Sequence, residues 1–115
     1  MQPNAFGKAF IARRRVFGGW FMSGSPTVLE AMGYAGYDFV VIDMEHGTEP
    51  IHGLRSLLQA IDATPTMNVV RMASHDPIAT KHALDLGAMS LYFPFVQTAD
   101  DAKAIASACY YPPQG

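Results

Sequence analysis

Short apolar runs alternate with segments of helical periodicity along this 115-residue chain, and no other feature restricts the fold as much. The runs cover residues 19–22, 39–43, 68–71 and 90–93 and predict strands that start near residues 19, 39, 67 and 89. A turn signal and a helical segment follow each run, so the order β-α repeats along the chain. That order predicts parallel strands joined by right-handed crossover helices.

The helical segments open with residues that cap helix N-termini. Ser25 and Asp76 each precede a proline, which is favoured at the first helical position, and Thr98 precedes two acidic residues in a first turn. The remaining helix follows Pro50, with leucine and isoleucine at helical spacing. These patterns predict helices over residues 25–36, 51–61, 76–87 and 98–109, with Val28, Leu29, Met32 and Ala35 on the inner face of the first.

Two architectures accommodate serial βα units: a small doubly wound sheet and half of an eight-unit barrel. The loop after the first predicted strand, residues 23–26, matches neither G-x-G-x-x-G nor the P-loop pattern, and its proline lacks an amide that a phosphate would use. We therefore predict an α/β fold of parallel (β/α) units that forms the N-terminal half of a (β/α)8 TIM barrel. Residues 1–115 are expected to form a single partial domain of four βα units, with the second half of the barrel absent.

Composition excludes several classes of protein. Half of the residues are hydrophobic and 16% are charged, which argues against disorder. A net charge of −2 argues against a nucleic-acid partner, and no apolar segment reaches the roughly 20 residues of a membrane span. The single cysteine, Cys109, and the lack of a visible secretory signal predict a cytoplasmic protein. We interpret Cys109 as a buried packing residue and the basic run 13–15 as a solvated N-terminal helix end.

The chemistry is expected at the C-terminal ends of the strands, where barrel enzymes place their active sites. The run 39–42 ends in Asp43, Glu45 and His46, and Arg71 ends the next run. A histidine can move a proton, a carboxylate three residues earlier can orient its ring, and an arginine can bind a carboxylate with two hydrogen bonds. The combination predicts a small acidic substrate. Plainer interpretations are a turn histidine at 46, an ion pair of Arg71 with Glu45 or Asp43, and surface or capping roles for His52, His75 and His82.

Several motifs, in the order found here, resemble those of one enzyme family. They are G-Y-A-G-Y-D-F at 33–39, I-D-M-E-H-G at 42–47, V-V-R at 69–71, H-D-P at 75–77 with Lys81, L-D-L-G-A at 84–88, P-F-V-Q-T-A-D-D-A at 94–102 and Y-P-P-Q-G at 111–115. On these residues the chain resembles the HpcH/HpaI aldolase family, the metal-dependent pyruvate aldolases that include 2-dehydro-3-deoxyglucarate and 4-hydroxy-2-oxoheptanedioate aldolases. The resemblance implies a (β/α)8 barrel that assembles as a homo-oligomer, commonly a hexamer.

The resemblance also implies a reaction and a role for each site residue. The reaction is a reversible retro-aldol cleavage of a 4-hydroxy-2-oxo acid to pyruvate and an aldehyde, through a metal-stabilised enolate. His46 matches the general acid/base, which acts through water on the substrate hydroxyl, and Asp43 and Asp85 match the carboxylates that tune and orient it. Arg71 matches the residue that binds the substrate carboxylate and steadies the enolate. The role of Asp85 depends on the resemblance alone.

A divalent metal ion (Mg²⁺, Mn²⁺ or Co²⁺) is the implied cofactor, and its family ligands, a Glu and an Asp, are expected beyond residue 115, so that this chain alone holds none of them. Two alternatives stay open: a half-barrel that serves only in assembly, and an oxaloacetate decarboxylase-type activity that uses the same enolate. A small doubly wound binding domain for an acidic ligand is the least favoured interpretation.

Overall fold

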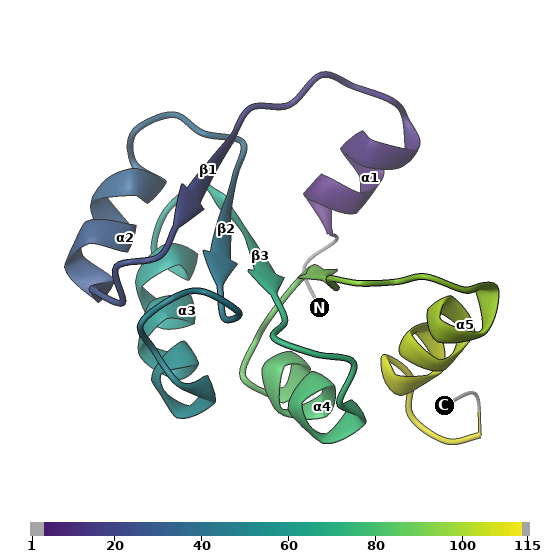
Figure 1. The fold of residues 1–115 in the computed structure, drawn as a ribbon. Helices are drawn as coiled ribbons and strands as arrows, with labels where there is room; N and C mark the ends of the chain where they lie inside the picture. The colour runs from purple at the N-terminus through teal and green to yellow at the C-terminus, as the bar shows by residue number, and fades with distance from the viewer. Residues whose placement is uncertain (1–3, 114–115) are drawn as a thin grey trace.

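A computed structural model describes residues 4–113 of the chain (Figure 1). Its elements follow in the order α1 (Ala5–Ile11), β1 (Gly18–Phe21), α2 (Pro26–Gly33), β2 (Phe39–Asp43), the 3₁₀ helix η1 (Ile51–Gly53), α3 (Leu54–Asp62), β3 (Met67–Arg71), α4 (Pro77–Asp85), β4 (Leu91–Tyr92) and α5 (Ala99–Ala108). The predicted repetition of strand and helix is therefore confirmed. Gln114 and Gly115, which end the last of the motifs above, lie outside the described residues.

The strands form one parallel sheet in the order β1-β2-β3-β4. Each strand thus pairs with the one that precedes it in the sequence, as in the wall of a barrel, whereas a doubly wound sheet reverses its strand order near the middle. The register pairs Val41 with Val69 and Asp43 with Arg71, so the carboxyl ends of β2 and β3 end at the same edge of the sheet. The doubly wound alternative is excluded by this order.

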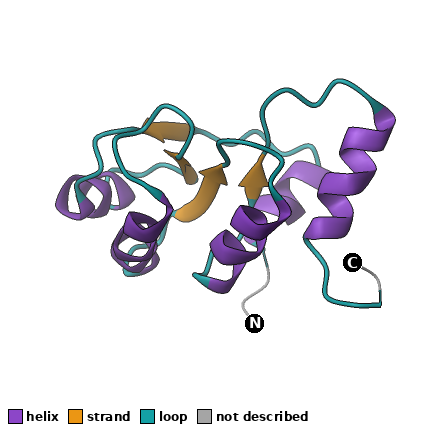
Figure 2. Cartoon of the chain, turned by 60° about the horizontal axis from the view of Figure 1, so that its bottom comes forward, coloured by secondary structure: helices purple, strands orange, loops and turns teal. Residues whose placement is uncertain are grey.

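Side chains alternate between the two faces of a strand, so each face of the sheet carries its own set of residues. The two faces also pack against different helices. Helices α2, α3 and α4 lie along the outer side of the sheet, as the purple helices beside the orange strands in Figure 2 show. The hydrophobic core lies between these helices and the sheet. It consists of Phe21, Leu29, Val40, Ile42, Leu54, Leu57, Leu58, Ile61, Val70, Met72, Ala83 and Ala88. A buried leucine or isoleucine contributes about 1.5–3 kcal/mol, so this layer stabilises the fold.

The inner face of the sheet carries the alternate strand residues, those that point away from α2, α3 and α4. Other parts of the chain cover this face only in part. Helix α1 lies over its N-terminal part, where the ring centroids of Phe6 and Phe39 are 4.7 Å apart. A hollow of about 540 Å³ remains between this helix and the carboxyl ends of the strands, and its lining includes Trp20, Val41, Val69 and Tyr92. The inner face therefore leads directly to the edge where Asp43 and Arg71 end their strands.

The helix caps are formed by the residues that the sequence indicated. Asp76 accepts hydrogen bonds from the backbone of Ile78 and Ala79, and Thr98 forms a reciprocal capping box with Asp101. Ser25 caps α2, but that helix ends at Gly33 and not at Gly36. None of the helices in the described part of the chain is long and apolar enough to cross a membrane.

Two predictions about helix burial are wrong. Val28 and Ala35 were expected on the inner face of α2, but both are exposed, because only Leu29 and Gly33 of that helix are fully buried and Ala35 lies beyond its end. Cys109 was expected to be buried, and it is exposed. No residue of α5 is buried among those described, because this helix packs beside α4 and away from the sheet (Figure 1). The basic run 13–15 is exposed after α1, as predicted.

Candidate active site

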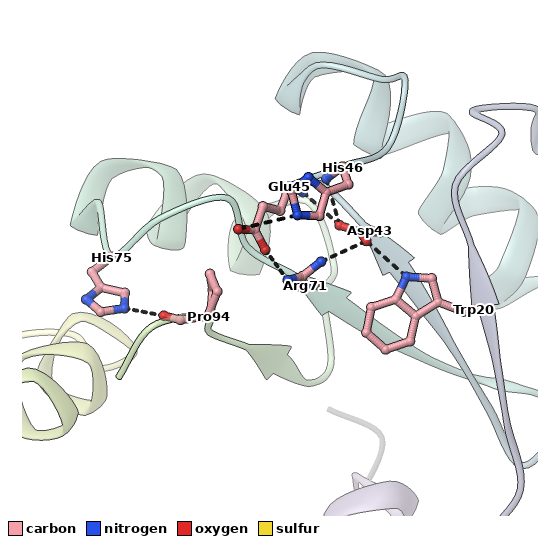
Figure 3. Close-up of polar contacts among 7 residues, drawn as sticks. All are labelled: Trp20, Asp43, Glu45, His46, Arg71, His75 and Pro94. Atoms are coloured by element: carbon pink, nitrogen blue, oxygen red, sulfur yellow. Dashed lines mark hydrogen bonds and ion pairs between the residues drawn. The ribbon is translucent and has the colours of Figure 1, made fainter. Parts of the chain in front are cut away.

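Three of the four predicted site residues lie together at the carboxyl edge of the sheet (Figure 3). Asp43 and Arg71 are the last residues of β2 and β3 and are partners in the register, so their side chains leave the same face. Tyr92 is the register partner of Arg71 on β4, and Trp20 reaches the group from β1. Every strand of the sheet therefore contributes one side chain to this edge.

Asp43 is the centre of the hydrogen-bond network. Its Oδ1 accepts from the backbone N–H groups of Glu45 and His46 at 2.9 and 3.0 Å. Its Oδ2 accepts from the indole of Trp20 at 2.9 Å and from Arg71 Nη1 at 3.0 Å. Burial on its own would raise the pKa of Asp43, but these four donors outweigh it and lower the pKa from 3.8 to about 2. The residue is therefore a carboxylate at any pH near neutrality.

Arg71 is held by two acids and two aromatic rings. Besides its bond to Asp43 Oδ2, its Nη2 forms an ion pair with Glu45 Oε2. The guanidinium carbon lies 5.6 Å from the ring centroid of Trp20 and 5.9 Å from that of Tyr92, within the range of cation–π attraction. Its Nε is buried and donates to no group among residues 4–113. The ion pair that was the plainer interpretation of Arg71 is thus present, with both Asp43 and Glu45.

His46 follows in the turn after β2, and its side chain is 64% exposed. Its Nε2 lies 3.8 Å from Glu45 Oε1. The expectation that Asp43 orients the histidine ring is not met, because the Asp43 carboxylate binds the backbone of His46 and leaves the ring beside Glu45. The tightness of this turn requires Gly47, since a Cβ there would collide with the carbonyl of Asp43. Asp43 therefore positions the histidine through its main chain.

Asp85 does not join the cluster within one chain. It ends α4, which returns from the carboxyl end of β3 to the start of β4, and the backbone N–H of Met89 just beyond it binds Asn68 at the start of β3. Asp85 itself accepts a hydrogen bond of 2.8 Å from Tyr111 in a groove of about 680 Å³ beside α4. Asp85 thus lies toward the opposite edge of the sheet from His46.

His75 and Cys109 make contacts that do not involve the Asp43–Arg71 cluster. His75 lies 2.6 Å from the carbonyl oxygen of Pro94 and links the segments that follow β3 and β4 (Figure 3). Cys109 is exposed but lines the groove beside Asp85, where neighbouring groups desolvate its thiol and raise the pKa. A raised pKa lowers the thiolate fraction, which disfavours a nucleophilic role for this cysteine.

Sequence reasoning gave no role to Trp20 or Tyr92 and only a general one to Glu45. Aromatic residues in an apolar run have the pattern of packing residues, so composition gave no signal for the two rings. The register of the strands does relate Trp20 to the site. Trp20 pairs with Val41, and Asp43 lies two residues further along β2, so the side chains of Trp20 and Asp43 leave the same face of the sheet. Glu45 comes two residues after Asp43 and was detectable only as a polar residue at a strand end.

The implied metal ion does not fit the residues described here. No group of three or more His, Cys, Asp or Glu side chains within residues 4–113 is arranged to hold a metal ion. The two carboxylates at the edge are already engaged by Arg71, and Asp43 Oδ1 is occupied by two amides.

A parallel sheet in sequential order, with charged groups at its carboxyl edge, is typical of the class of (β/α)8-barrel proteins. Comparison with known proteins agrees: the model of the HpcH/HpaI aldolase/citrate lyase family matches residues 17–115, and the chain belongs to that family. The fold is the N-terminal half of its TIM barrel.

Individual relatives give the same result. The chain is 46% identical over 98 residues to a 2-dehydro-3,6-dideoxy-6-sulfogluconate aldolase of Pseudomonas putida, covering 85% of this chain and 38% of that protein. It is 40% identical over 113 residues to a 4-hydroxy-2-oxovalerate aldolase of Novosphingobium aromaticivorans, covering 97% and 43%. A crystal structure of a family member from Burkholderia cenocepacia J2315 superposes with a TM-score of 0.83 at 39% identity, over 87% of this chain and 41% of that one. The chain thus spans less than half the length of these relatives.

Proposed function

We propose that this chain provides the proton-transfer and carboxylate-binding part of a carbon–carbon lyase, which cleaves a 4-hydroxy-2-oxo acid to pyruvate and an aldehyde. The observation that supports it most is the position of Arg71, a cation held by two acids beside an exposed histidine at the carboxyl edge of the sheet. The similarity to curated aldolases supports the same class of reaction.

Arg71 suits the anionic end of such a substrate. Its nitrogens carry more N–H donors than Asp43 and Glu45 use, so a substrate carboxylate or 2-oxo oxygen can be bound without breaking the pair with Asp43. The rings of Trp20 and Tyr92 lie next to the guanidinium and take the place of part of its hydration, which strengthens electrostatic attraction there. When the C3–C4 bond breaks, its electron pair moves to the enolate, and the negative charge develops on the 2-oxo oxygen next to this cation.

His46 suits the proton transfers. Its exposed ring can take the proton of the C4 hydroxyl, directly or through a water molecule, as that carbon becomes the aldehyde carbonyl. The same proton can then be returned to C3 of the enolate, which completes pyruvate, so that the atoms of substrate and products balance. Glu45 Oε1 lies 3.8 Å from His46 Nε2, so the Glu45 carboxyl group stands beside the ring during both proton transfers.

The proposal has further parts that the family resemblance supplies. They are a requirement for Mg²⁺, Mn²⁺ or Co²⁺, a small 2-oxo acid such as pyruvate as ligand, a homo-oligomeric assembly and a cytoplasmic location. Asp85 is not given a step here, because within one chain it contacts Tyr111 and not His46.

A pyruvate-release assay tests the function. The 115-residue chain is incubated with 4-hydroxy-2-oxopentanoate, with and without each divalent ion, and pyruvate is measured with lactate dehydrogenase. His46→Ala is expected to lower the rate by about 10²–10⁴-fold, the usual worth of a general acid/base. His52→Ala, on an exposed histidine of η1, is the matched control and is expected to retain the rate.

A wild-type rate no higher than that of His46→Ala would refute the proposal and favour a role in assembly alone. Pyruvate from oxaloacetate but not from the aldol substrate would favour the decarboxylase alternative.

A further inference from the structure

Two aromatic side chains lie next to the guanidinium that the proposed function assigns to substrate binding. The Arg71 side chain is 17% exposed, whereas Trp20 and Tyr92 are 50% and 48% exposed. The rings of Trp20 and Tyr92 meet edge to face, with centroids 6.3 Å apart and planes at 85°. The exposed parts of both rings line the hollow of the inner face. They therefore touch the cation on one side and open space on the other.

Trp20 acts on the same centre in a second way. Its indole N–H donates to Asp43 Oδ2 at 2.9 Å, and that same oxygen accepts from Arg71 Nη1 at 3.0 Å. The indole thus fixes the oxygen with which the guanidinium pairs, while its ring faces the guanidinium itself. Trp20 therefore contacts both members of the Asp43–Arg71 pair, one with its N–H group and the other with its ring.

We propose that Trp20 and Tyr92 are positioning residues for the 2-oxo acid, which set the plane of the Arg71 guanidinium so that it meets a small carboxylate whose short carbon tail lies over the aromatic wall. The planar fork of arginine recognises a carboxylate only when the two planes are aligned, so a freely rotating guanidinium binds it less well. The hollow of about 540 Å³, lined by Val41, Val69 and the two rings, accommodates a short apolar tail. This inference rests on the proposed function, because it concerns the same substrate.

Conservative variants separate positioning from simple packing. Tyr92→Phe keeps the ring, and Tyr92→Leu keeps an apolar side chain but removes the π-face. Trp20→Phe keeps a ring and removes the indole N–H that Asp43 accepts. Tyr110→Leu, at an exposed tyrosine in the groove beside α4, is the matched control for loss of a tyrosine. Circular dichroism and thermal unfolding establish that each variant folds.

Binding of pyruvate and of oxalate, a planar analogue of its enolate, is measured for every variant by isothermal titration calorimetry, and KM and kcat are measured by pyruvate release. We expect Tyr92→Leu to raise the dissociation constant and KM roughly two- to fivefold, the worth of one cation–π contact, with kcat nearly unchanged. Trp20→Phe is expected to raise both on the order of three- to tenfold. Tyr92→Phe and Tyr110→Leu are expected to bind like the wild type.

Trp20 is the only tryptophan of the sequence, so its emission gives a second measurement. Addition of oxalate is expected to change the emission of the wild type and of Tyr92→Phe with the same dissociation constant as calorimetry, and to do so at higher concentration in Tyr92→Leu. If folded Tyr92→Leu and Trp20→Phe bind as tightly as a wild type that binds oxalate, positioning by the rings is refuted and the proposed function stands. If the wild type neither binds nor turns over a 2-oxo acid, the proposed function fails, and this inference fails with it.

Discussion

Replacing Asp43 by asparagine tests the central contact of the site. The carboxylate accepts from two backbone amides, an indole and a guanidinium, and only 4% of the residue is exposed. Asparagine has nearly the same shape but no charge, so Arg71 would keep only Glu45 as an anionic partner. Loss of one partner from a buried ion pair costs roughly 3–5 kcal/mol, and we expect Asp43→Asn to lie at the lower end because Glu45 remains.

The pH dependence provides the sharper measurement. Folding lowers the pKa of Asp43 from 3.8 to about 2, so the ionised form stabilises the folded state at every pH above 3.8. At ~1.36 kcal/mol per tenfold change in acid strength, this contribution is about 2 kcal/mol. It is lost as the pH falls from 3.8 through about 2, where the folded protein must also take up the proton. Asp43→Asn has no carboxyl group at position 43, so its free energy of unfolding does not include this loss at low pH.

Urea unfolding of the wild type and of Asp43→Asn at pH values from about 2 to 6 measures the difference directly. The gap between their free energies of unfolding is expected to be constant above about pH 4 and to narrow by about 2 kcal/mol toward pH 2. Asp100→Asn is the matched control, because Asp100 is 91% exposed and pairs only with Lys103 among the described residues. A gap that stays constant to pH 2 would show that Asp43 is not held as the structure indicates.

Three further predictions follow from the site and the core. Glu45→Gln removes the acid that lies between Arg71 and the ring of His46, so it is expected to lower kcat for pyruvate release by about tenfold. An equal kcat in the wild type and in Glu45→Gln would contradict a role for Glu45 between these two residues. Leu58→Ala, at a leucine 1% exposed in α3, is expected to lower the free energy of unfolding by about 2–5 kcal/mol, whereas Val28→Ala, at a valine 47% exposed in α2, is expected to change it by less than about 0.5 kcal/mol in urea titrations. Sedimentation of the chain is expected to show association, because β1 and β4 are open edges of the sheet and Phe10, Phe95 and Tyr111 are exposed; a stable compact monomer would disprove this.

The order of elements was predictable because it depends on local chemistry. Ser25, Asp76 and Thr98 cap their helices in the structure as their side chains indicated. Gly87 adopts a φ of +113° beyond the end of α4, a conformation that glycine reaches without strain. The parallel pairing of the strands then followed from the βα order, and the position of Asp43 and Arg71 followed from that pairing.

The details that sequence did not predict depend on tertiary geometry. A carboxylate three residues before a histidine can reach either its ring or its backbone amide, and in the tight turn that ends at Gly47 Asp43 binds the amide. The contact of Trp20 with Arg71 crosses β2, which lies between their strands, so the spacing of the two residues in the sequence carries no sign of it. The exposure of Cys109 depends on which surface α5 meets, and the spacing of its apolar residues carries no information about that surface.

The alternation of side chains in the strands separates stability from chemistry in this fold. Ile42 and Val70 face the helices and are fully buried, whereas their neighbours Asp43 and Arg71 face the inner side and carry the charges of the site. A charged residue at position 42 or 70 would lie in the apolar core without partners, and a one-residue slip of either strand would place it there. The charges are tolerated because they lie at the last position of each strand, where the 44–46 turn and the ring of Trp20 supply donors. The same register that closes the core therefore also brings the carboxylate, the guanidinium and the histidine turn together.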